Sequence, residues 1–304
     1  MPDIRLILQN ALQAQVAIPA FNVPYLAMVE PVIRAVTDQD SFAMIETARL
    51  EWVKFEAVGP EAVAKEFLRW QNPKHISLHL DHIPVIDEDG QQVDYLADIQ
   101  QAIDLGYHSV MVDGSRLALN ENIAATRKVA ELAHQAGLPC EAELGAILGH
   151  EAGPPPPYDE LFASGKGFTK VEEARRFVAE SGCDWLSVAI GNIHGAISEG
   201  LKDQKKIAAQ LDLDHLQRLA RAASIPLVLH GGSGIPREYV LASFQKGIAK
   251  INIATEIRQA YETALQATRK LSAAQEAVYE RTNWLIGEYF GLNGIRATVT
   301  QESP

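Results

Sequence analysis

The feature that most constrains this chain is a strict alternation of eight short apolar runs with longer stretches of helical periodicity. The short runs predict strands at 16–23, 41–48, 75–82, 109–115, 139–145, 185–190, 225–231 and 247–254. The stretches after them predict helices at 26–38, 60–70, 94–105, 119–136, 171–181, 213–223, 236–245 and 256–272. Such alternation favours a parallel sheet with helices outside it. Eight strands close a barrel, whereas a doubly wound sheet usually has fewer, so we predict an α/β fold of the (β/α)8, or TIM-barrel, type.

The whole chain, residues 1–304, is expected to form one barrel domain. The barrel would extend over about 16–272, with a helical C-terminal extension at 273–304. Thr169, with Glu172 three residues later, predicts a capping box at the start of the helix 171–181. The connections 146–168 and 195–211 are too long for simple turns. Because both follow strands, they would lie on the catalytic face of a barrel, although they could equally be surface decoration.

Charge and composition exclude several classes of protein. A net charge of −12 repels nucleic acid and anionic membrane surfaces, so neither is an expected partner. Two cysteines are too few for a disulfide framework or a cysteine-based zinc motif. Charged and polar residues interrupt the N-terminal apolar run, unlike in a signal peptide, and no apolar stretch approaches the roughly 20 residues that cross a bilayer. We therefore expect a cytoplasmic protein.

Three histidines fall at the ends of different predicted strands. His82 follows the run ISLHLD, His194 lies just beyond LSVAIGN, and His230 ends PLVL. A closed barrel would bring these three strand ends around one space, where neutral imidazoles are common ligands of catalytic zinc. Each histidine alone could instead be a hydrogen-bonded residue at a strand end.

Acidic residues gather at the same predicted strand ends. Asp81 adjoins His82 and could either transfer a proton or orient a histidine. Asp113 lies near the end of the predicted fourth strand, and alternation places Glu141 and Glu143 on one side of the fifth. A buried carboxylate needs a cation or a donor, so these residues would contact a cation, a substrate or a structural partner.

Two glycine-rich or threonine-bearing turns lead from strands into helices. HGGSGIPREYV (230–240) follows the seventh strand and INIATEIRQA (251–260) the eighth. Backbone N–H groups at a helix start, together with the hydroxyls of Ser233 and Thr255, can form an anion cradle. In barrels the loops after strands seven and eight are the usual phosphate site.

These segments resemble the metal-dependent, or class II, fructose-bisphosphate and tagatose-bisphosphate aldolase family. The matching motifs are AFNV (20–23), HLDH (79–82), SVMVDGS (109–115), EAELG (141–145), VAIGNIHG (188–195), LHGGSGIP (229–236) and KINIAT (250–255). They occur in family order from about Ala20 to Glu256. The resemblance implies a TIM-barrel lyase of carbohydrate metabolism that cleaves or forms a C–C bond in a phosphorylated ketose, releasing a dihydroxyacetone-phosphate-like product and an aldehyde.

The resemblance also implies roles for individual residues. His82, His194 and His230 would hold Zn²⁺ or another divalent metal, and Asp81 would move the proton on the hydroxyl of the departing aldehyde. Asn252 would contact the dihydroxyacetone-phosphate portion. Asp113 and Glu143 match acidic positions near the metal, where a second, monovalent cation or the substrate could be contacted. The residues implied around the phosphate are Gly195, Gly231, Gly232, Ser233, Ala254 and Thr255.

The sequence departs from the family pattern after the second strand. The family usually has a serine near the substrate where Ala48 stands, and Arg49 adds a cation beside it. We therefore expect an atypical aldehyde half, with Arg49 binding an anionic one. Alternatively, Arg49 forms a salt bridge with Glu46 or Glu51.

Two further functions remain open at this point. The scaffold could support another metal-assisted reaction, an isomerisation or a hydrolysis, because fold alone does not fix chemistry. It could also be a sugar-phosphate-binding barrel without catalysis, although such a protein would not need a proton-transferring Asp81. Apolar residues in the C-terminal tail lead us to expect a homo-oligomer, either a dimer or a tetramer.

Overall fold

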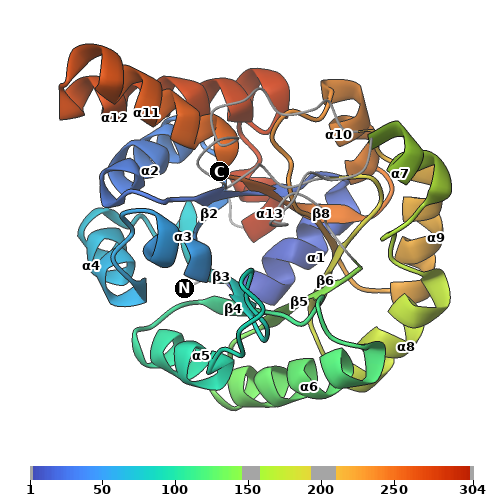
Figure 1. Ribbon diagram of the computed structural model, residues 1–304. Helices are drawn as coiled ribbons and strands as arrows, with labels where there is room; N and C mark the ends of the chain where they lie inside the picture. Colours follow the sequence, from blue (N-terminus) through green and yellow to red (C-terminus); the bar gives the residue numbers. More distant parts are fainter. Residues whose placement is uncertain (1–2, 146–157, 193–209, 302–304) are drawn as a thin grey trace.

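The computed structural model describes residues 3–145, 158–192 and 210–301. Its strands form one closed parallel barrel in chain order, each paired with the next and the eighth with the first, which confirms the predicted TIM barrel (Figure 1). The strands are β1 (Ile18–Asn22), β2 (Ala43–Ala48), β3 (Ile76–Pro84), β4 (Ser109–Asp113), β5 (Cys140–Leu144), β6 (Trp185–Val188), β7 (Leu227–Leu229) and β8 (Ile248–Ile253).

Helices surround the barrel because each has one apolar face to bury against the strands. Those of the predicted repeat are α2 (Val29–Asp38), α4 (Pro60–Trp70), α5 (Tyr95–Asp104), α6 (Leu119–Gln135), α8 (Val171–Ser181), α9 (Leu213–Ala223), α10 (Arg237–Phe244) and α11 (Thr255–Thr268). The short η1 (Leu26–Met28) precedes α2. None of the helices in the described part of the chain is long and apolar enough to cross a bilayer.

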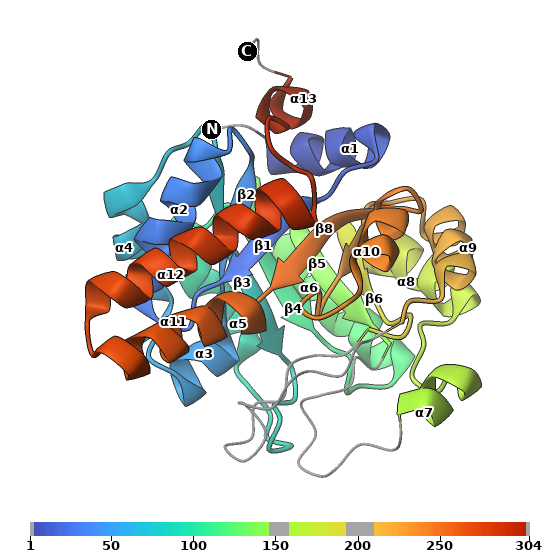
Figure 2. The ribbon, with the colours of Figure 1, turned by 90° about the horizontal axis from the view of Figure 1, so that it is seen from above.

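Both chain ends add helices outside the repeat. α1 (Ile4–Ala14) packs with α13 (Arg296–Thr300) at one end of the barrel (Figure 2). The predicted C-terminal extension is helical: α12 (Leu271–Trp284) packs on α11 and α2, and a π-helical turn, η2 (Leu285–Tyr289), follows it. Arg269, with a left-handed φ of 55°, ends α11 and separates it from α12.

Three local predictions need correction. The segment after β2 forms α3 (Arg49–Lys54), and part of the connection predicted at 146–168 forms α7 (Tyr158–Ser164). The Thr169 capping box is wrong, because the N-cap of α8 is Lys170. The Thr169 hydroxyl instead accepts the N–H of Ala189 and donates to the carbonyl of Leu144, which joins the ends of β5 and β6.

Candidate active site

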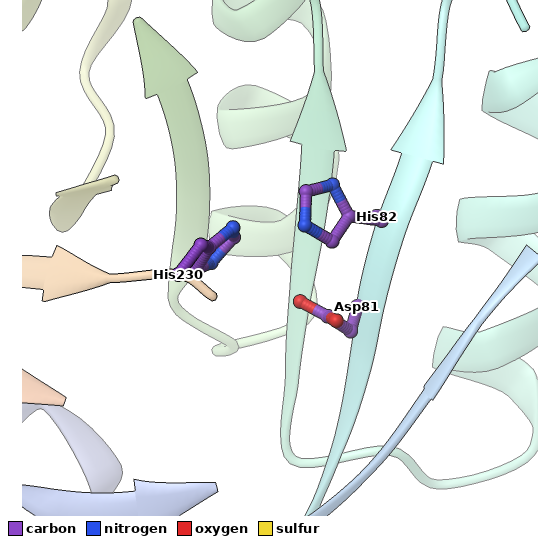
Figure 3. Close-up of side chains that lie close together, drawn as sticks. All are labelled: Asp81, His82 and His230. Atoms are coloured by element: carbon purple, nitrogen blue, oxygen red, sulfur yellow. The ribbon is translucent and has the colours of Figure 1, made fainter. Parts of the chain in front are cut away.

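A bulge in β3 turns two neighbouring side chains toward the same space. Between Leu80–Val110 and Ile83–Val112 the pairing with β4 skips a residue, and His82 adopts a left-handed φ of 36°. In a regular strand Asp81 and His82 would face opposite sides of the sheet. A bulge re-aims a side chain, and strain of this kind, about 1–3 kcal/mol, is typical of functional sites. Figure 3 shows Asp81 and His82 together beside His230.

Carboxylates orient the His82 ring. Its Nδ1 lies 3.3 Å from Oδ2 of Asp113 at the end of β4, and its Nε2 lies 4.0 Å from Oε2 of Glu143 on β5. Burial acts to lower the pKa of His82, but Asp81, Asp113 and Glu143 together raise it well above its ordinary value. These carboxylates therefore stabilise a positive charge at the His82 imidazole, either a bound proton or a metal ion.

His230 follows β7 directly and is completely buried. Its Nε2 bonds to Oε1 of Glu141 at 2.8 Å, and its Nδ1 lies 3.0 Å from Oε2 of Glu143. Its backbone carbonyl accepts the side-chain N–H of Asn192. The ring centroids of His230 and His82 are 4.4 Å apart. Glu141 and Glu143 thus do share one side of β5, as alternation predicted.

The donor set fits a divalent metal ion. Ligand atoms of Asp81, His82 and His230 all lie within 4.8 Å of one another, and so do those of His82, Asp113 and Glu143. Imidazole nitrogens with carboxylate oxygens are zinc ligands, and the contacts to Glu141 and Asp113 are the hydrogen bonds that usually orient metal-binding histidines. His194 and Gly195 lie outside the described residues.

Two asparagine amides hold Asp81, one at each carboxylate oxygen. Asn22, at the end of β1, donates Nδ2–H to Oδ2 at 2.9 Å, and Asn252 on β8 donates to Oδ1 at 3.1 Å. Burial acts to raise the pKa of Asp81, but His82, Lys250 and His230 lower it below its usual value. The result is an ionised carboxylate with fixed orientation next to the histidines.

A buried polar layer lies within the barrel, and sequence reasoning missed most of it. Lys250 and Glu46 are wholly buried, with Nζ 2.6 Å from Oε1 of Glu46 and 2.9 Å from Oε2 of Glu141. His79, which bonds to Ser109 at 2.7 Å, lies 3.4 Å from Glu141. A lysine inside the apolar strand IAKINIA was the available signal, since a fully buried lysine is almost always paired.

The anion cradle predicted from the sequence would lie between the turn after β7 and the start of α11. Gly231 has a φ of 67°, and Gly232 donates its N–H to the carbonyl of Asn252. Ser233 is buried, and its hydroxyl has no hydrogen-bond partner in the described part of the chain. Ala254 is the N-cap of α11, and Thr255 is its first residue. A buried hydroxyl beside a helix start is a site that a phosphate oxygen could satisfy.

A pocket of about 930 Å³ opens beside this cradle. Its lining includes Ser233, Thr255 and Arg281 of α12. Arg281 is paired with Glu256 of α11, whose other carboxylate oxygen accepts the N–H of Gly234. The pocket therefore extends from the turn after β7 along α11 to α12.

Arg49 starts α3 and lies next to two carboxylates. Its guanidinium nitrogens are 3.7 Å from Asp87 and 3.8 Å from Asp98. Glu46 is instead paired with Lys250, and Glu51 accepts the backbone N–H of Ala48. Arg49 therefore does pair with carboxylates, but they are Asp87 and Asp98 and not Glu46 or Glu51 as considered from the sequence.

Comparison with known proteins decides the family. The profile described as fructose-bisphosphate aldolase class-II matches residues 3–299. The chain belongs to the class-II fructose-bisphosphate aldolase family. A fructose-bisphosphate aldolase of Streptococcus pneumoniae is 32% identical over 285 residues, covering 92% of this chain and 88% of that protein. One of Streptococcus pyogenes is 32% identical over 276 residues, covering 90% and 85%.

Solved structures agree with this assignment. The YdjI aldolase from Escherichia coli K12 is similar with a TM-score of 0.74 and 28% identity, covering 96% of this chain and 98% of the other. A putative fructose-1,6-bisphosphate aldolase from Coccidioides immitis is similar with a TM-score of 0.74 and 27% identity, covering 95% and 96%. As a member of the class II family, this chain is a metal-dependent aldolase.

Proposed function

We propose that this class II aldolase cleaves and forms a C–C bond in a phosphorylated ketose, releasing a dihydroxyacetone-phosphate-like ketone and an aldehyde. The observation that carries this proposal is the convergence of Asp81, His82 and His230 on one space at the strand ends. The buried hydroxyl of Ser233, which none of the described residues satisfies, supports a phosphorylated substrate.

The metal in this proposal is Zn²⁺, held by His82, His230 and His194. The proposal for His194 rests on its sequence position two residues after Asn192, which bonds to the His230 carbonyl. A zinc ion here would withdraw electrons from the ketose carbonyl and so stabilise the negative charge left after C–C cleavage. The group of His82, Asp113 and Glu143 would be the place for a second, monovalent cation or a further substrate contact.

The protein side chains would carry the proton and hold the substrate. In the cleavage direction Asp81 accepts the proton of the aldehyde-side hydroxyl, the C–C bond breaks, and the bonding electron pair moves onto the ketone fragment. That fragment takes up a proton at the same carbon before it leaves as the ketone. Asn252 contacts that fragment while its amide also holds Asp81. The residues that we propose around the phosphate are Gly195, Gly231, Gly232, Ser233, Ala254 and Thr255.

The aldehyde half is the part of the substrate that we propose to be atypical. Ala48 stands where the family usually has a serine, and Arg49 begins α3 at the same strand end. Asp87 and Asp98 hold Arg49 only at 3.7 and 3.8 Å, so an anionic aldehyde could compete for its guanidinium. Turnover of a panel of ketose phosphates by Arg49→Ala tests this, because equal losses on every substrate would exclude recognition.

A coupled reductase assay tests the reaction itself. An aldolase releases a ketone phosphate from a ketose phosphate. A reductase then reduces the released ketone phosphate and oxidises a reduced nicotinamide cofactor, whose absorbance falls. We expect activity that chelation abolishes and zinc restores. An isomerase or a hydrolase would convert the substrate without this signal, and a binding protein would leave it unchanged.

We further propose that the protein forms a homo-oligomer. Leu271 and Trp284 are exposed on α12, 51% and 39% respectively, where apolar side chains would gain from a partner. Sedimentation analysis tests this proposal, and a monomer at micromolar concentration would contradict it.

A further inference from the structure

Lys250 lies at the centre of the buried polar layer, where three of its contacts fix its ammonium group. Nζ lies 2.6 Å from Glu46, 2.9 Å from Glu141 and 2.8 Å from Oδ1 of Asn252. The side chain is wholly buried, so bulk solvent does not compete for these positions. Because Glu46 on β2 and Glu141 on β5 hold it from different strands, the ammonium cannot move without breaking an ion pair.

This ammonium dictates the orientation of the Asn252 amide. A lysine has three donors and no acceptor, so the amide atom at 2.8 Å from Nζ must be the oxygen. Lys250 and Asn252 are two residues apart on β8 and share one face of the strand, which makes the contact local. With Oδ1 on Lys250, Nδ2 necessarily faces Asp81, to which it donates at 3.1 Å.

Asp81 depends on this orientation. A flipped Asn252 would present its carbonyl oxygen to Oδ1 of Asp81, and two acceptors would repel each other. Of the two asparagines, Asn22 alone would then hold the carboxylate, through its other oxygen. Ligand atoms of Glu46, His79 and Asp81 also lie within 4.8 Å of one another, as at a cation site. The Lys250 ammonium, 2.6 Å from Glu46, supplies positive charge to this cluster.

We propose that Lys250 is a positioning residue for the aldol reaction, one that acts by locking the Asn252 amide so that it holds Asp81 in place. The inference rests on the proposed function, since it concerns the carboxylate that moves the proton in that reaction. Lys250 itself touches no reacting atom.

The test uses the full-length, zinc-saturated enzyme and two changes at Lys250. The double variant Lys250→Met/Glu46→Gln removes both charges of one ion pair, so that no unpaired carboxylate remains at position 46. The single variant Glu46→Gln is its reference. Lys250→Arg keeps the charge between Glu46 and Glu141 but replaces the compact ammonium by a planar fork. Lys246→Met is the matched control, because Lys246 is a partly exposed lysine whose one ion pair among the described residues is with Asp214.

We expect the double variant to lose about 100-fold in kcat relative to Glu46→Gln, the effect of misplacing a reacting group by about 1 Å. Lys250→Arg should lose at least about tenfold in kcat, and Lys246→Met should behave as wild type. A crystal structure of the double variant should show the Asn252–Asp81 hydrogen bond broken. If the double variant does not fold, Lys250→Arg decides.

A merely structural role predicts a different result. Tm would fall, but kcat of the folded, zinc-saturated variants would stay within about threefold of their references, and that would overturn the proposal. So would a zinc-loaded wild-type crystal structure in which Nζ of Lys250 does not contact Asn252. Absence of ketose phosphate cleavage by the wild type would instead refute the proposed function, so the two failures are distinguishable.

Discussion

Gly232→Ala is a sharp test of the phosphate cradle, because the structure gives the size of the clash. A Cβ at this position would lie 2.6 and 2.8 Å from side-chain atoms of Ile251 and 2.9 Å from the carbonyl oxygen of Asn252. Ile251 is completely buried, and the third atom belongs to the backbone of β8. Neither neighbour can yield freely, so the turn after β7 must move away from β8.

The expected magnitude follows from that displacement. Overpacking of this kind costs about 1–3 kcal/mol of unfolding free energy. The shift also breaks the hydrogen bond from the Gly232 N–H to Asn252 and moves the cradle relative to Asp81. We expect kcat/KM for a phosphorylated ketose to fall about 100-fold, as for other misplacements of about 1 Å.

Steady-state kinetics and thermal unfolding measure the two effects separately. Gly287→Ala is the matched control, since Gly287 also lacks a positive φ and its new Cβ would meet only the flexible end of Gln39, at 3.3 Å. That variant should retain wild-type kinetics. If Gly232→Ala retained wild-type kcat/KM within twofold, the cradle would not bind the substrate as proposed.

Three further predictions concern the carboxylate, the metal and pH. Asp81→Asn should lower kcat by about 100- to 10,000-fold while zinc content, measured by metal analysis, stays near wild type; an active variant would exclude Asp81 as the proton carrier. Glu141→Gln should weaken zinc binding about 10- to 100-fold, because Glu141 orients His230, and competition with a chromophoric chelator measures this; unchanged affinity would contradict that role. Burial lowers the pKa of His108 to about 4, and its ring accepts the N–H of Leu78. Between about pH 6.5 and about pH 4 the unfolded chain therefore binds a proton at this histidine that the native protein does not bind. Urea unfolding should show the free energy of unfolding falling as the pH drops through this range. His108→Asn should show a smaller loss, and an equal loss would rule out this histidine as its source.

The barrel could be predicted from the sequence because its signal repeats along the chain. Every strand–helix unit has an apolar run followed by an amphipathic stretch, and local errors such as the missed α3 do not change the number of units. The Thr169 cap failed for a physical reason: its hydroxyl bonds to the backbone at Leu144 and Ala189 instead of its own helix. Tertiary contacts outweighed a local motif there.

The strand ends that carry the candidate site residues could be predicted from the sequence, but the geometry there could not. The strand ends indicated His82, His230 and Asp81. Regular alternation, however, would have placed His82 on the opposite face from Asp81. No local sequence pattern predicts the bulge that brings the two side chains together. The layer around Lys250 was missed because its partners, Glu46 and Glu141, come from strands far apart in the sequence.

The central claim is that histidines from distant strands share one metal ion, and diffraction at the zinc absorption edge tests it most directly. For crystals of zinc-loaded protein, we predict an anomalous peak between the rings of His82 and His230, about 2.0–2.1 Å from one nitrogen of each. A third imidazole, from His194, should complete the coordination. Zinc bound elsewhere, with no peak between these two rings, would contradict the account.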